Sequence, residues 1–156
     1  MAALVAAAVA IALLPNCTEG CTELGCGPAF TIELDEGVFA GGDYQMVVTS
    51  DGVTTSCTVT LPIASCPDGF SCDRPDPGFF IELNDCGGTL ERLEAIVFHT
   101  QAPAQIDVEV SKAGTVLGSD SFQPAYTTSQ PNGPDCEPTC KQTQAAVTLD
   151  LDWEQI

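Results

Sequence analysis

Positive charge is almost absent from this 156-residue sequence, which has four Lys and Arg residues against 22 Asp and Glu and a formal net charge of −18. A protein that binds nucleic acid needs a basic patch to neutralise phosphates, and four scattered cations cannot form one. Nucleic-acid binding is therefore excluded, as is electrostatic adsorption to an anionic lipid surface. The acidic residues are spread along the whole chain, which is typical of a solvated surface.

The residues and motifs of common catalytic sites are also scarce. His99 is the only histidine, and no Gly-x-Ser-x-Gly turn of a hydrolase nucleophile accompanies it. The sequence has no P-loop and no dinucleotide-binding glycine motif. Trp153 and two tyrosines offer little surface for stacking on sugars. We therefore expect a protein without enzymatic activity, and a secreted hydrolase is only the third hypothesis.

An apolar, uncharged segment occupies the first 14 residues and consists almost entirely of Ala, Val, Leu and Ile. Its length fits the core of a signal peptide and falls short of the roughly 20 residues that span a bilayer. The following Leu14-Pro15-Asn16-Cys17 resembles the bacterial lipoprotein signal, in which a leucine lies three residues before an acylated cysteine. We predict a signal peptide over residues 1–16 and lipid attachment at Cys17. The alternative is cleavage after Ala10 or Ala12, which would give a secreted protein.

Cysteine is abundant, with nine residues in the chain. In an exported protein this density indicates a disulfide framework, and the absence of C-x2-C pairs disfavours zinc. If Cys17 carries lipid, the remaining cysteines can form four bridges. These residues are Cys21, Cys26, Cys57, Cys66, Cys72, Cys86, Cys136 and Cys140. Their spacing suggests that Cys66 and Cys72 close a short loop, and that the first two of the set meet the last two.

One loop also contains the only candidates for a metal site. Asp68, Asp73 and Asp76 lie close together in a segment rich in Pro and Cys. Clustered oxygen ligands suit Ca²⁺, although Asp in such a loop also serves simply to make turns. A calcium-dependent module that binds a glycan or a protein is therefore the alternative function, and no other cofactor is expected.

Alternation of apolar and polar residues runs through most of the chain after residue 28. This period of two predicts strands over residues 29–35, 44–50, 53–61, 78–84, 93–100, 105–112, 115–122 and 145–154. Asp51-Gly52 is a strong hairpin signal, and no helix is expected after the leader. The sequence predicts an all-β, antiparallel, immunoglobulin-like β-sandwich of about eight strands over residues 29–156, stapled by disulfides. A Cys- and Gly-rich linker over residues 17–28 precedes it.

A family resemblance is carried by the cysteines behind the apolar leader, the run of strands, and the segment from Tyr126 through Pro131-Asn132-Gly133-Pro134-Asp135-Cys136-Glu137-Pro138-Thr139-Cys140. Over nearly its whole length the chain resembles small Cys-rich exported lipoproteins of myxobacteria and their relatives. The resemblance implies a location in the bacterial cell envelope and a sandwich fold, and it carries over no catalytic residue. We therefore expect an interaction or structural module that is held at the membrane by a lipid anchor and contacts an envelope or extracellular protein or glycan.

Overall fold

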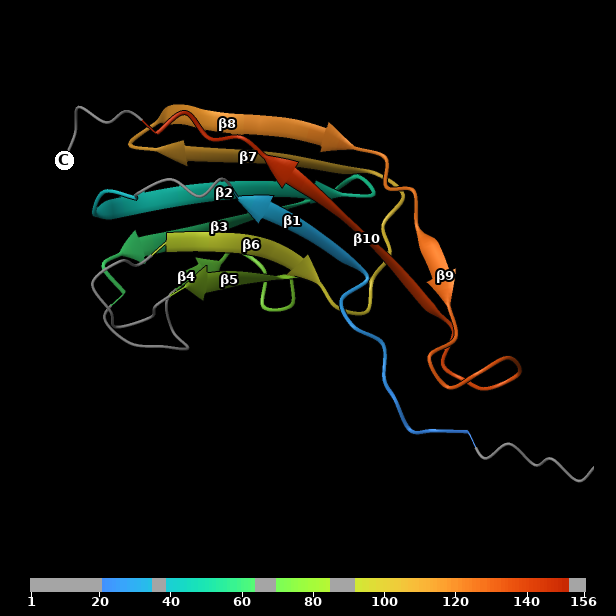
Figure 1. Ribbon diagram of the computed structural model, residues 1–156. Helices are drawn as coiled ribbons and strands as arrows, with labels where there is room; N and C mark the ends of the chain where they lie inside the picture. The colour runs from blue at the N-terminus through green and yellow to red at the C-terminus, as the bar shows by residue number, and fades with distance from the viewer. Residues whose placement is uncertain (1–20, 35–38, 64–69, 85–91, 152–156) are drawn as a thin grey trace, which may run out of the picture.

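The protein is represented by a computed structural model that describes residues 21–34, 39–63, 70–84 and 92–151. Within these ranges the chain forms ten strands in two sheets that pack face to face (Figure 1). One sheet has the order β5-β6-β1-β10-β9 and the other β4-β3-β2-β7-β8. The strands are β1 (Phe30–Leu34), β2 (Gly42–Ser50), β3 (Val53–Leu61), β4 (Phe70–Cys72), β5 (Phe80–Asn84), β6 (Arg92–Phe98), β7 (Ile106–Lys112), β8 (Thr115–Phe122), β9 (Thr127–Ser129) and β10 (Cys140–Val147).

The alternation in the sequence decides which side chains enter the core. In β3, Cys57, Val59 and Leu61 are buried between the sheets, while the threonines between them face outward. Successive side chains of a strand point to opposite faces, so each long strand contributes one apolar row. The largest fully buried side chains are Tyr44 and Phe30. Each buried side chain of this kind stabilises the fold by about 1.5–3 kcal/mol. The predicted disulfide-stapled β-sandwich is confirmed.

The strand order matches that of an immunoglobulin variable domain with one replacement and one added edge strand, β9. In that fold one sheet holds strands D, E, B and A, and the other holds C″, C′, C, F and G. Here β5, β6 and β1 take the D, E and B positions, while β4, β3, β2, β7 and β8 take the positions from C″ to G. The A position is occupied by β10 from the other end of the chain, and β10 pairs with β1 in parallel. All other strand pairings among the described residues are antiparallel, as predicted.

Two short strands lie where the sequence predicts loops. Strands β4 and β9 have three residues each, which is too short to display a period of two. The last strand also differs, because it begins at Cys140 and ends at Val147 instead of covering residues 145–154. Its first half is mostly exposed and polar and pairs with β9, so it lacks the apolar alternation that identifies a half-buried strand. Residues 152–154 of the predicted strand lie outside the described residues.

Tight turns join β2 to β3 and β7 to β8. Asp51 and Gly52 have φ values of 48° and 81°, and Ala113 and Gly114 have 50° and 82°. Two consecutive positive φ values define the turn type that matches the twist of a hairpin. The hairpin predicted at Asp51-Gly52 is confirmed. These two turns mark opposite ends of the second sheet, because β2 and β7 run antiparallel.

Candidate functional site

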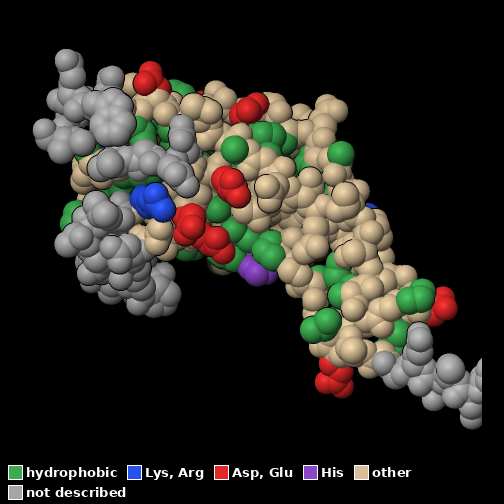
Figure 2. Space-filling view, viewed as in Figure 1, with side chains coloured by type: hydrophobic (Ala, Val, Ile, Leu, Met, Phe, Trp, Pro, Cys, Tyr) green, Lys and Arg blue, Asp and Glu red, His purple; other side chains and the backbone are tan. Residues whose placement is uncertain are grey.

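A narrow lobe projects from the end of the sandwich at which β1 begins (Figures 1 and 2). It consists of residues 21–28, which we call the strap, together with β9 and the loop over residues 130–139. Two disulfides join the strap to the rest of the lobe. They are Cys21–Cys136 and Cys26–Cys140, with Cα–Cα distances of 5.7 and 5.4 Å and sequence separations of 115 and 114. The predicted contact between the first two and the last two of the eight cysteines is confirmed.

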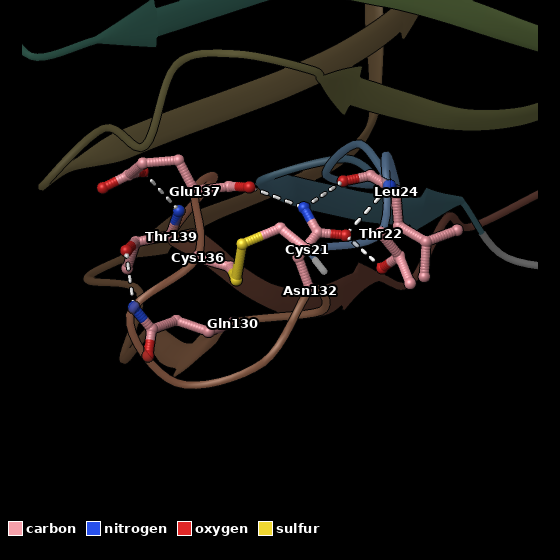
Figure 3. Close-up of a disulfide and its surroundings, with 8 residues drawn as sticks. All are labelled: Cys21, Thr22, Leu24, Gln130, Asn132, Cys136, Glu137 and Thr139. Carbon is pink, nitrogen blue, oxygen red and sulfur yellow. Dashed lines mark hydrogen bonds between the residues drawn. A yellow bond between two sulfur atoms is a disulfide. The ribbon is translucent and has the colours of Figure 1, made fainter. Parts of the chain in front are cut away.

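Asn132 fastens the strap between these two bridges (Figure 3). Its Oδ1 accepts hydrogen bonds from the Leu24 backbone N–H at 2.9 Å and from the Thr22 hydroxyl at 2.6 Å. Its Nδ2 donates to the carbonyl oxygens of Leu24 at 3.1 Å and of Glu137 at 2.6 Å. The amide thus pairs with both backbone polar groups of Leu24, as a neighbouring strand would. Sequence reasoning missed Asn132 because its partners on the strap lie more than a hundred positions away.

The strap contributes almost nothing to the hydrophobic core. Residues 21–26 are all exposed, and the Leu24 side chain is 57% exposed. Burial begins only at Ala29, directly before β1. The two disulfides and Asn132 therefore hold the exposed strap against the rest of the lobe, whereas the hydrophobic effect contributes little to this contact.

A third disulfide, Cys57–Cys72, joins neighbouring strands in the second sheet. The two cysteines lie directly opposite each other in the pairing of β3 with β4. The prediction that Cys66 and Cys72 close a loop is therefore wrong, because strand pairing brings Cys72 to Cys57 instead. Cys66 and Cys86 lie outside the described residues, as does the lipidation candidate Cys17. The fourth bridge and the lipid anchor stay predictions.

The two described calcium candidates both accept hydrogen bonds from backbone N–H groups. Asp73 Oδ1 accepts from the Ser56 backbone N–H at 3.1 Å, and Asp76 Oδ1 accepts from the Gly78 backbone N–H at 3.2 Å. The third candidate, Asp68, lies outside the described residues. In the described part of the chain, no three His, Cys, Asp or Glu side chains are grouped so that they could hold a metal ion. Asp76 thus forms a local turn, whereas Asp73 bonds across to β3, and the calcium site stays a prediction.

The only histidine lies at the rim of the sandwich, directly after β6. The exposed His99 ring stacks on Phe80, with a centroid distance of 4.5 Å and an interplanar angle of 21°. Figure 2 shows this histidine in purple on the same face of the molecule as a group of carboxylates beside a cation. A surface hollow there is lined by Glu33, Glu82 and Arg92, among others. These side chains lie on the outer face of the first sheet, away from the lobe.

Tyr126 anchors the crossover from the second sheet to the first. Its hydroxyl donates to the Pro103 carbonyl oxygen at 2.8 Å, and its ring meets the Phe30 ring edge-on at 6.4 Å. Burial raises the pKa of Tyr126 above its ordinary value, and the negative charge of Asp51 raises it further. The hydroxyl therefore stays protonated and continues to donate well beyond neutral pH. This contact fixes the chain just before it enters the lobe.

No family model, curated protein or solved structure shows a significant match to this chain. In the ranges that the structure describes, no helix is long and apolar enough to cross a bilayer. The lobe is the candidate site on the geometry of its own residues. Two disulfides and one buttressing amide hold an exposed segment in place at the end of the sandwich nearest Cys17 in sequence.

Proposed function

We propose that this chain is a domain of an exported bacterial lipoprotein, tethered to the envelope membrane through Cys17 and without enzymatic activity. The observation that carries the proposal is the pair of disulfides between the strap and the lobe, Cys21–Cys136 and Cys26–Cys140. Disulfides of this kind persist in oxidising compartments outside the cytosol, so they support export. An exported protein needs a signal sequence, and the apolar leader followed by Cys17 resembles the signal of a bacterial lipoprotein.

The surface supports a role as an interaction or structural module. A formal net charge of −18 favours contact with a basic partner surface over an anionic one. The outer face of the second sheet presents carboxylates and hydroxyls, such as Asp43 hydrogen-bonded to Thr60 and Thr49 to Thr54. Such a face suits polar contacts with an envelope or extracellular protein or glycan.

Metabolic labelling with radioactive palmitate tests the tether. We expect the wild-type protein to incorporate the label and the Cys17→Ser variant to lose it. The matched control is the double variant Cys21→Ser/Cys136→Ser, which removes two other cysteines and should still be labelled. Incorporation that Cys17→Ser leaves unchanged would contradict the proposal. The mass of the mature N-terminus separates an acylated Cys17 from cleavage after Ala10 or Ala12.

A further inference from the structure

The strap is held at two points along its length, not at one. Cys21 and Cys26 bind Cys136 and Cys140 in the same order along the chain, so the two bridges form the rungs of a short ladder. Asn132 pairs with Leu24, which lies between the two strap cysteines in sequence, and Figure 3 shows this pairing beside the Cys21–Cys136 bridge. A single bridge fixes a point on a segment, whereas two bridges and an intervening amide fix its direction.

The second rung restricts the unfolded chain much less than the first does. A disulfide stabilises mainly by restricting the unfolded chain, and its effect grows with the logarithm of the loop that it closes. Cys26–Cys140 already closes a loop of more than a hundred residues. Once it has formed, Cys21–Cys136 closes only a small ring through the first bridge, and strap residues 21–26 are all exposed. What the second rung adds most clearly is a fixed course for the chain.

We propose that the strap is an orientation clamp, an inference that rests on the tether proposed at Cys17. It fixes the direction in which the chain leaves the sandwich, so that the lobe is held nearest the membrane and the opposite end of the sandwich points away from it. With the clamp closed, the tether from Cys17 to Cys21 reaches at most about 14 Å, at roughly 3.6 Å per residue. With the clamp open, the tether extends to Ala29 and reaches about 43 Å.

In this pose the two ends of the sandwich differ in their distance from the bilayer. The turn before Val53 lies at the lobe end, beside the residues that lead into β9, whereas Val116 follows the turn at the opposite end (Figure 1). Along the strands the two positions are about 17 Å apart, because the β7 residues aligned with them, Ile106 and Ser111, lie five residues apart at roughly 3.3 Å per residue. The end that carries the Ala113-Gly114 turn is then the part of the domain farthest from the membrane and free to meet a partner.

Energy transfer to a bilayer tests the clamp. The full mature chain is refolded with its disulfides, and Cys17 is coupled to a maleimide lipid in phosphatidylcholine vesicles that contain an acceptor dye. The donor is attached to an azidophenylalanine that replaces either Val53 or Val116, which are 49% and 51% exposed. We expect clearly higher transfer efficiency from position 53 than from position 116.

Opening the clamp should make the two efficiencies converge. The open variant replaces the four cysteines of both rungs by Ser and carries Asn132→Ala, which lets the domain tumble on the longer tether. The matched control is Gln130→Ala, which removes the 3.5 Å hydrogen bond from Gln130 to Thr139 in the same loop without touching the strap. It should preserve the difference between the two positions.

Two results would overturn the clamp: equal efficiencies in the intact protein, or a difference that persists in the open variant. If the open variant does not fold, Cys21→Ser/Cys136→Ser combined with Asn132→Ala keeps Cys26–Cys140 and should still reduce the difference. An unreduced difference in that variant contradicts the clamp equally. Because Cys17 is coupled chemically, a failure of palmitate labelling in cells refutes the tether alone and leaves this measurement intact.

Discussion

Replacing Gly118 by alanine should detach the tail that follows β10 from the second sheet. The tail crosses β8 at this glycine, where the Asp150 backbone N–H donates to the Leu117 carbonyl oxygen at 2.7 Å. That carbonyl is available because a shift of register between β7 and β8 leaves Leu117 out of the ladder. A Cβ atom on Gly118 would lie 2.5 Å from the Thr148 carbonyl oxygen and 2.8 Å from Leu149 Cδ2. A backbone oxygen cannot rotate away, so the tail must move.

The cost of this movement follows from what the tail contributes. Leu149 is 6% exposed, and its removal from the core forfeits about 1.5–3 kcal/mol of burial. The lost backbone hydrogen bond adds about 1 kcal/mol. We therefore expect Gly118→Ala to lower the free energy of unfolding by roughly 2–4 kcal/mol, with a ceiling set by complete detachment of the tail. Urea unfolding measures the change, and hydrogen exchange at the Asp150 amide should accelerate.

Gly25→Ala is the matched control, because a Cβ atom there meets nothing within 4 Å. Its free energy of unfolding should stay within about 0.5 kcal/mol of the wild type. A Gly118→Ala protein that is equally unaffected, with the Asp150 amide still protected, would refute the close approach of the tail to β8.

Three further predictions concern a turn, a phenol and a bridge. Ala113→Gly should raise the free energy of unfolding, measured in urea, by about 0.5–1 kcal/mol, because φ is 50° at this position. The strain of alanine in this left-handed conformation exceeds the entropy that glycine adds to the unfolded chain. The raised pKa of Tyr126 means that the folded state holds this proton more tightly than the unfolded state does, so the stability of the wild-type protein should fall as pH rises above about 10. Tyr126→Phe should weaken that fall, and it should also remove the hydrogen bond to Pro103 at every pH. Peptide mass mapping of the oxidised protein should recover Cys66 linked to Cys86, since the other six downstream cysteines are paired; free, alkylatable thiols at both would contradict four bridges.

The long strands could be predicted closely because their signal is local. Strands β3 and β8 have the bounds expected from the sequence, and both begin directly after hairpin turns that contain a glycine. Strands β4 and β9 could not be found, since a three-residue strand exists only through its pairing with a neighbour. The same holds for Cys57–Cys72, because spacing along the chain favoured Cys66 as the partner and strand register decided otherwise.

Local alternation and composition by themselves determined the all-β class and the acidic character of the chain, because both depend on residue types close together in sequence or on counting. Tertiary structure alone decided that β10 occupies the first-strand position beside β1 and that Asn132 binds Leu24. These pairings join residues more than a hundred positions apart. They stabilise the chain only when the rest of the fold has brought its two ends together, because closing so long a loop costs entropy.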